Sequence, residues 1–220
     1  MIIAQIASLP DRVESLRLTI ASLRKQVDKL FIALNGYKEV PEFILKDPFI
    51  EYVVLDNSLG DAAKFYDIDK RDGYFFACDD DLIYPKNYID FMIDKIEQYR
   101  CVVSLHGRSF KIRPIQSYYK SATDKYRCLG TVNKDVYVDV AGTGTMAFIT
   151  NDIKVRLSDF RMANMADIWL SKIAHEQKVP LLVTAHKEGF LKYIPQTRTI
   201  WDDEHMKDAY QTEVVNSFLK

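Results

Sequence analysis

Three consecutive carboxylates, Asp79, Asp80 and Asp81, come directly after the most apolar segment of the chain, residues 74–78. A run that is apolar at every position is typical of a strand buried on both faces. Side chains two residues apart on an extended chain share a face, so Asp79 and Asp81 can point at one cation, or at a cation and a ribose. Their oxygen ligands suit Mg²⁺ or Mn²⁺. The alternative is a solvated acidic turn, but carboxylates this close repel unless a cation compensates them.

The elements that would position these carboxylates alternate along the sequence. Short apolar runs predict strands, and stretches with apolar residues three or four apart predict amphipathic helices. This alternation predicts an α/β fold with a mostly parallel central sheet flanked by helices, in which right-handed crossovers gather the strand ends at one edge. Ligands of open α/β sheets bind at that edge. The expected strands cover residues 2–7, 30–34, 52–55, 74–78, 101–105, 145–149 and 181–184, and the expected helices cover residues 11–27, 61–66, 163–177 and a segment starting at Pro85.

Composition narrows the class of protein independently of any motif. The chain has 220 residues, 48% of them apolar and 28% charged, which is typical of a folded globular domain. Its 30 basic and 31 acidic residues nearly cancel, so charge gives no sign of a nucleic-acid partner. No apolar run has the length of a transmembrane segment, and the first residues do not resemble an export signal. Three cysteines without a metal-binding spacing predict reduced thiols and a cytoplasmic protein.

The buried run that ends in Asp79, Asp80 and Asp81, with a helix expected from Pro85, resembles the Asp-x-Asp motif of GT-A-fold glycosyltransferases. More narrowly, the chain is similar to the bacterial family 2-like enzymes that build surface polysaccharides. The resemblance covers roughly residues 1–190. It implies a single GT-A-like, Rossmann-like domain. The expected parts are a nucleotide-sugar-binding half at residues 1–107, an acceptor and catalytic half at residues 108–194, and a C-terminal tail at residues 195–220.

The same resemblance implies a set of residues that bind the nucleotide-sugar donor. In the family, a basic residue before the acidic motif approaches the phosphates, and Lys64 matches that position. Where the family often has an aspartate that binds uracil, this chain has Asn35. Lys64 fits an ordinary helix-surface lysine equally well, and Gly142 and Gly144 fit a simple tight turn almost as well as a close approach to the donor sugar. The implied donor-binding residues are Ala7, Ser8, Arg12, Asn35, Gly60, Lys64, Asp79, Asp80 and Gly144.

The resemblance also implies a divalent metal ion, Mn²⁺ or Mg²⁺, that bridges the donor diphosphate. Asp79 and Asp81 match the family's metal ligands, and His186, after the last expected strand, matches a histidine that some GT-A enzymes add. An isolated histidine is otherwise an ordinary core or surface residue. Family members carry a Glu-Asp pair at the start of a later helix, where Asp167 matches the second acid and Ala166 replaces the first. Asp167 is expected to deprotonate the acceptor, the alternative being a plain helix cap.

The function that the resemblance implies is metal-dependent, inverting transfer of a sugar from a nucleoside-diphosphate sugar, with UDP favoured by its frequency in the family. The acceptor is expected to be a hydroxyl of a growing surface glycan or of a lipid-linked glycan. The enzyme would then work in the cytoplasm, or peripherally at the inner membrane face. Residues 108–137, rich in Tyr, Lys and Arg, form the expected acceptor side. Within it Tyr118, Tyr119 and Lys120 fit ordinary surface residues equally well, and no acceptor-binding residue is singled out. His106 fits a donor, acceptor or structural role equally.

Two other functions are compatible with the same sheet. A nucleotidyltransferase would share the metal, but the segment after the first strand, residues 7–12, lacks the glycines of its nucleotide-binding loop. A GT-A domain that has lost catalysis and binds a glycan or a partner is the second. The sequence contains no P-loop, no complete dinucleotide-binding glycine motif and no nucleophile elbow, which argues against the enzyme classes built on those motifs.

Overall fold

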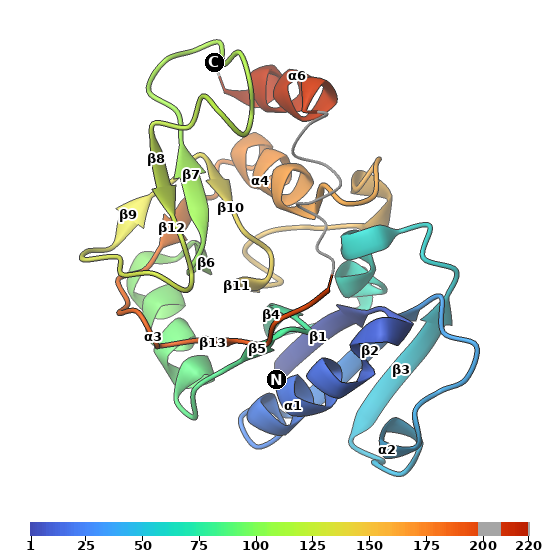
Figure 1. The fold of residues 1–220 in the computed structure, drawn as a ribbon. Coiled ribbons are helices and arrows are strands. Elements are labelled where there is room, and N and C mark those ends of the chain that lie inside the picture. The colour runs from blue at the N-terminus through green and yellow to red at the C-terminus, as the bar shows by residue number, and fades with distance from the viewer. Residues whose placement is uncertain (198–207, 220) are drawn as a thin grey trace.

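The computed structural model describes residues 1–197 and 208–219, which form an α/β fold around one large sheet (Figure 1). In spatial order its strands are β3 (Ile50–Leu55), β2 (Lys29–Asn35), β1 (Ile2–Ser8), β4 (Tyr74–Asp79), β11 (Thr145–Ile149), β6 (Val102–Ser104), β12 (Leu181–Val183) and β9 (Val136–Tyr137). Neighbouring strands run parallel except at β11, which is antiparallel to β4 and β6, and at β9, which is antiparallel to β12. The predicted fold class, with a mostly parallel sheet, is confirmed.

Helices cover both faces of this sheet, which explains why residues 74–78 of its central strand β4 are all apolar. On β4, Phe76 and Cys78 belong to the core on one face, and Phe75 and Ala77 belong to the core on the other. The two-residue alternation of an extended chain therefore divides one apolar run between two cores. The helices are α1 (Val13–Leu23), α2 (Glu42–Leu45) and α3 (Tyr88–Tyr99) on the first face, and α4 (Ala166–Glu176), α6 (Ala209–Phe218) and the 3₁₀ helix η2 (Gly60–Phe65) on the second.

The helices that follow β1 and β4 begin later than the sequence predicts, as does α4, which starts at Ala166 and not at residue 163. Helix α3 begins three residues beyond Pro85, after a turn at residues 86–87. The strand β5 (Leu82–Ile83) precedes that turn and pairs antiparallel with β13 (Lys192–Tyr193). Helix α1 follows the 3₁₀ turn η1 (Pro10–Arg12), and no side chain caps its start. The shifts of α1 and α3 leave more irregular chain at the carboxyl ends of β1 and β4.

The segment without clear periodicity, residues 108–137, contributes to a second, smaller sheet. Its strands are β10 (Val140–Ala141), β7 (Gly107–Ser109) and β8 (Asp124–Tyr126), and all pairs are antiparallel. This sheet lies beside β12 (Figure 1). Strands of two or three residues are too short to show the alternation by which strands are found in a sequence. Two further 3₁₀ helices are η3 (Ile68–Lys70) and η4 (Leu157–Asp159).

The predicted C-terminal tail, residues 195–220, contains helix α6, which packs on α4 (Figure 1). Val214, Val215 and Leu219 are buried in the core between these helices and the sheet. Residues 198–207 and 220 of the predicted tail lie outside the described residues. None of the helices in the described part of the chain has the length and apolar composition of a membrane span.

Candidate active site

Two adjoining cavities open at the edge of the sheet where the parallel strands β1, β2 and β4 end. The smaller one, the strand-end cavity, has a volume of about 330 Å³ and is lined by eight of the predicted donor-binding residues: Ala7, Ser8, Arg12, Asn35, Gly60, Lys64, Asp79 and Asp80. The larger one, the Asp167 cavity, has a volume of about 530 Å³ and is lined by Asp81, Gly144 and Asp167 among others. The two form one continuous site, because both are lined by Arg12, Asp61, Lys64, Asp79 and Asn164.

A half-buried cation, Arg12, and a buried one, Lys64, compensate the three carboxylates at the end of β4. The Nη1 atom of Arg12 lies 2.9 Å from Oδ1 of Asp80 and 3.5 Å from Oδ2 of Asp81. The Nζ atom of Lys64 contacts Oδ1 of Asp79. Burial by itself would lower the pKa of Lys64, but the nearby carboxylates, that of Asp79 first, hold it above its usual value. Lys64 is therefore a buried cation of the site and not a lysine of the helix surface.

Asp79 and Asp81 both line the Asp167 cavity and are the residues available to hold a divalent cation. Burial and the negative charges of Asp79 and Asp80 raise the pKa of Asp81 to about 7. When all three carboxylates are ionised, their negative charge exceeds the positive charge of Arg12 and Lys64. Among the described residues, no three His, Cys, Asp or Glu side chains form a complete metal site. Mg²⁺ commonly binds through one or two carboxylates and takes its other ligands from substrate phosphates and water. The two aspartates fit a cation that arrives with a phosphate ligand.

The structure does not bring His186 to this site. The histidine lies beyond β12, which β6 and β11 separate from β4, a distance of ~14 Å at the usual strand spacing. Its Nδ1 lies 2.8 Å from the carbonyl oxygen of Thr184, and its Nε2 lies 3.2 Å from that of Arg127. Its backbone pairs with Val132. Because both ring nitrogens meet backbone carbonyls, we treat His186 as a buried structural residue and leave it out of the metal site.

Gly144 has no room for a side chain, because Asp79 lies against it. A Cβ atom placed on Gly144 would overlap the carboxylate of Asp79. The backbone nitrogen of Asp79 donates to the carbonyl oxygen of Gly144 at 3.0 Å, and the hydroxyl of Tyr84 donates to the same carbonyl at 2.6 Å. The glycine is therefore required by the close approach of the acidic motif, and a tight turn does not by itself explain it.

Asp167 is held through one carboxylate oxygen. Its Oδ1 accepts hydrogen bonds from the backbone nitrogen and the hydroxyl of Thr143, both at 2.7 Å. Its Oδ2 has no hydrogen-bond partner within the described residues. The alternative of a plain helix cap does not hold, because Met165 occupies the cap position of α4 and Asp167 bonds to a different loop. Since Thr143 precedes Gly144, one short loop positions both Asp167 and the carboxylate of Asp79.

Asp61 is a site residue that the sequence analysis did not single out. It lies in η2, lines both cavities, and accepts a hydrogen bond from the backbone nitrogen of Ala166 at 3.1 Å. Burial raises the pKa of Asp61 to about 7; the positive charge of Lys64 opposes the increase, and Asp167 adds to it. Asp61 therefore joins the helix that carries Lys64 to the helix that carries Asp167. Its only sequence signal was an acid next to Gly60.

The Asp167 cavity also has an aromatic and basic wall. The guanidinium carbon of Arg108 lies 4.4 Å and 5.0 Å from the ring centroids of Tyr118 and Tyr119. All three residues line the cavity, whereas Lys120 is not among its lining residues. His106 lines it too, and burial lowers the pKa of its imidazole. The structure thus brings the predicted acceptor segment to Asp167 through Tyr118 and Tyr119.

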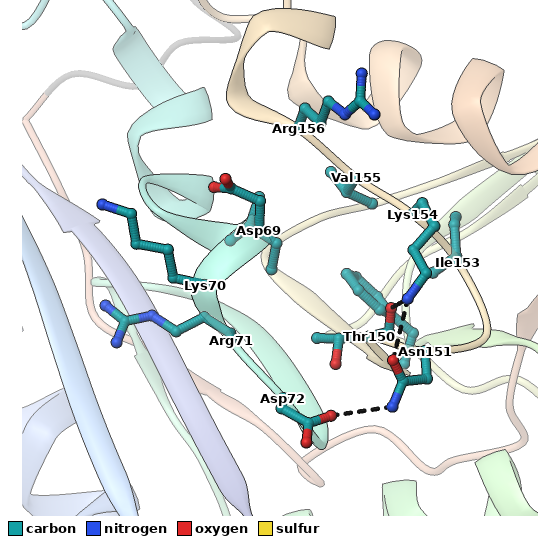
Figure 2. A pocket seen from close by; sticks show the side chains of 12 residues that line it. Asp69, Lys70, Arg71, Asp72, Thr150, Asn151, Ile153, Lys154, Val155 and Arg156 are labelled. Atoms are coloured by element: carbon teal, nitrogen blue, oxygen red, sulfur yellow. Dashed lines mark hydrogen bonds between the residues drawn. The ribbon is translucent and has the colours of Figure 1, made fainter.

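A third cavity, of about 380 Å³, contains none of the predicted site residues. Figure 2 shows that three of its polar side chains, those of Asp72, Asn151 and Lys154, are joined by hydrogen bonds. Lys154 donates to the carbonyl oxygen of Thr150 and to the side chain of Asn151. Asn151 in turn donates to Asp72 at 3.0 Å. Because these groups are already paired, we assign no ligand chemistry to this cavity.

Comparison with known proteins identifies the fold. No protein-family model matches the chain, and no curated protein matches its sequence. The crystal structure of residues 1–349 of TarS from S. aureus is similar, with a TM-score of 0.52 and 14% identity over 85% of this chain and 59% of that one. The same fragment in complex with UDP-GlcNAc has a TM-score of 0.55 and 15% identity over 96% of this chain and 62% of that one. The chain thus spans about six tenths of the length of these structures, and the likeness shows that it shares their α/β, Rossmann-like fold.

Proposed function

We propose that the chain is a metal-dependent, inverting glycosyltransferase of the GT-A type, similar to family 2 enzymes, that uses a nucleoside-diphosphate sugar. The observation that carries the proposal is the continuity of the two cavities, with Asp79 in both and Asp167 in the larger. A nucleotide in the strand-end cavity would set its phosphates beside Lys64 and the acidic motif, and its sugar beside Asp167. The likeness to the TarS fragment, which was crystallised with UDP-GlcNAc, supports the same class of donor.

Asn35 supports uracil as the base of the donor. Its Nδ2 donates to the carbonyl oxygen of Gly60 at 2.9 Å, which sets the orientation of the side-chain amide. Its Oδ1 is buried and has no hydrogen-bond partner within the described residues. A lone acceptor at the end of β2 suits the N3–H of uracil, a donor that cytosine lacks at N3. A buried acceptor left unpaired costs about 1–3 kcal/mol, so a base that donates to it is favoured.

The chain's own residues account for the reaction. Lys64 places a positive charge beside the expected diphosphate, and Asp167, held through Oδ1 by Thr143, leaves Oδ2 to accept the proton of the acceptor hydroxyl. The hydroxyl oxygen forms a bond to the anomeric carbon as the bond from that carbon to the diphosphate oxygen breaks. One displacement of this kind inverts the anomeric centre. A divalent cation on Asp79 and Asp81 supplies Lewis-acid stabilisation of the leaving group when bound.

The acceptor in this proposal is a hydroxyl of a growing surface glycan, free or lipid-linked, so that the enzyme acts in the cytoplasm or at the inner membrane face. Tyr118 and Tyr119 give the Asp167 cavity aromatic rings on which a sugar can stack. A domain that only binds a glycan, and a nucleotidyltransferase, would use the same strand-end cavity. The unpartnered oxygen of Asp167 favours the glycosyltransferase, because binding alone needs no base.

Calorimetric titration with UDP, with and without Mn²⁺, tests the donor site and the cation together. We expect binding to require Mn²⁺, and we expect Asp81→Asn to lose about tenfold or more of that affinity. Asp69→Asn, at the third cavity, is the matched control and should bind as the wild type does. Equal affinity of Asp81→Asn and wild type would remove Asp81 from the metal site.

Release of UDP from UDP-GlcNAc and other UDP-sugars separates catalysis from binding. A transferase should release UDP in a reaction that needs Mn²⁺ and Asp167. A wild-type protein that binds UDP with Mn²⁺ but turns over none of these donors would be a binding domain. Release of pyrophosphate from UTP and a sugar phosphate would instead identify a nucleotidyltransferase.

A further inference from the structure

Helix α6 sets the position of the aromatic wall of the Asp167 cavity. The side chain of Asn216 accepts from the backbone nitrogen of Ile115 at 2.8 Å and donates to its carbonyl oxygen at 2.9 Å. The hydroxyl of Thr212 accepts from the backbone nitrogen of Tyr118 at 2.9 Å. These bonds join segments about a hundred positions apart in the sequence. The C-terminal helix is therefore part of the construction of the site.

Gln211 is the residue of α6 that lines the Asp167 cavity. It is only 4% exposed. Its Oε1 is buried without a hydrogen-bond partner, and no hydrogen bond joins its Nε2 to another described residue. Because neither end of the amide has a partner among residues 1–197 and 208–219, exchanging its oxygen and nitrogen leaves it unpaired in either orientation. A buried amide left unpaired costs about 1–3 kcal/mol, so its presence at a cavity points to a ligand that pairs with it.

The position of Gln211 separates it from the nucleotide. Like Tyr118, Tyr119 and Asp167, it lines the Asp167 cavity and does not line the strand-end cavity. Most of the predicted donor-binding residues line the strand-end cavity. Aromatic rings with a convergent polar group are typical of sites that bury an amphipathic ligand such as a sugar ring. A primary amide offers both donors and an acceptor, which complements hydroxyl groups that also do both. An anionic group would use the donors and leave Oε1 unpaired.

We propose that Gln211 is a specificity-determining residue that hydrogen-bonds hydroxyl groups of a neutral acceptor sugar, in a subsite formed by α6 and residues 115–119. This inference rests on the proposed function, because it requires Asp167 to act on a hydroxyl held in the same cavity. The aromatic rings of the wall cover one face of the sugar, and the amide of Gln211 selects the hydroxyl pattern at its edge.

Gln211→Met tests this subsite, because methionine nearly preserves the length and volume of the side chain and removes its hydrogen bonding. Gln177→Met is the matched control. Gln177 is exposed at the end of α4, where its amide accepts from the backbone nitrogen of Lys154 at 2.9 Å and donates to the carbonyl oxygen of Lys154 at 2.7 Å. Among the described residues, the amide of Gln177 has hydrogen-bond partners and that of Gln211 has none. Loss of the amide should therefore lower the stability of the protein at position 177 and sugar binding at position 211.

Sugar binding is measured by saturation-transfer NMR with the methyl glycosides of glucose, galactose and N-acetylglucosamine, in the presence of UDP and Mn²⁺. We expect the wild type to bind at least one of them. Gln211→Met should weaken that binding about tenfold, the effect of a lost hydrogen bond or two, without lowering the thermal midpoint or the affinity for UDP. Gln177→Met should lower the thermal midpoint and bind the glycosides as the wild type does.

Three results would overturn the inference while leaving the proposed function in place. In the first, the Gln211→Met protein would bind the glycosides as tightly as the wild type does. In the second, the wild type would bind UDP but none of the glycosides. In the third, Gln211→Met would lower the thermal midpoint as Gln177→Met does. The last result would make Gln211 a structural residue. Failure of UDP to bind the wild type at all, with or without Mn²⁺, would instead overturn the proposed function.

Discussion

Replacement of Asp61 by asparagine should increase the free energy of unfolding at high pH and leave it unchanged at acidic pH. Asparagine keeps an oxygen that can accept from the backbone nitrogen of Ala166, as Asp61 does at 3.1 Å, and it removes the charge. Burial raises the pKa of Asp61 from 3.8 to about 7. Between these two pH values the folded protein keeps a proton that the unfolded chain has lost. The free energy of unfolding of the wild type therefore falls as pH rises through this window and stays low above it.

The size of the effect follows from the two pKa values. The difference between 3.8 and about 7 corresponds to ~4 kcal/mol in the free energy of unfolding. Asp61 is partly open to the cavity, where solvent weakens the penalty of ionisation, so we expect about 2 kcal/mol. Wild type and Asp61→Asn should thus be about equally stable near pH 4, and the variant should be about 2 kcal/mol more stable near pH 8.

Urea unfolding of both proteins at a series of pH values from about 4 to about 8 measures this difference. Asp61→Ala is the companion variant, because it removes the charge and also the hydrogen bond to Ala166. Its free energy of unfolding should depend on pH as that of Asp61→Asn does, but be lower at every pH by about 1 kcal/mol because the hydrogen bond is lost. A difference between Asp61→Asn and wild type that stays constant with pH would refute the reasoning, since Asp61 would then carry no penalty for ionising in the folded protein.

Three further substitutions test the site. Asp167→Asn should keep UDP binding and lower UDP-sugar turnover by about 10²–10⁴-fold, because an amide cannot accept the proton; turnover near that of the wild type would exclude Asp167 as the base. Gly144→Ala should weaken Mn²⁺-dependent UDP binding about tenfold or more, because the methyl group would displace the carboxylate of Asp79; an unchanged titration would contradict that close approach. Asn35→Leu should lower the ratio of UDP affinity to CDP affinity about tenfold, as measured by calorimetry. An unchanged ratio of the two affinities would exclude Asn35 from base recognition.

Most of the strand-end cavity could be predicted, because adjacent parallel strands deliver their last residues to one edge. Ser8, Asn35 and Asp79 end β1, β2 and β4, and these strands are neighbours. Each strand was visible as a short apolar run, and the general rule for α/β sheets supplied the rest. The apolar character of residues 74–78 also indicated correctly that β4 is covered on both faces.

The prediction for His186 shows where this reasoning stops. A histidine after a strand reaches the acidic motif only if its strand is a close neighbour of β4, and β11 and β6 lie between. The order of strands in a sheet is set by the packing of the whole chain, and the apolar run of β12 carries no information about it. The small sheet of β10, β7 and β8 was missed for another reason, since its strands are too short to show a period.

The sequence of residue types along the chain was enough to locate the acidic motif, the buried strand before it and the α/β architecture. Apolar periodicity and the residues at strand ends are both properties of consecutive positions. Tertiary packing alone determines which residues complete the site. They are Thr143 bonded to Asp167, Gly144 against Asp79, Asp61 bonded at the start of α4, and Gln211 from the C-terminal helix. Each of these joins segments far apart in the sequence, through strand order and helix docking. A single polar residue brought into place in this way leaves no pattern among its sequence neighbours.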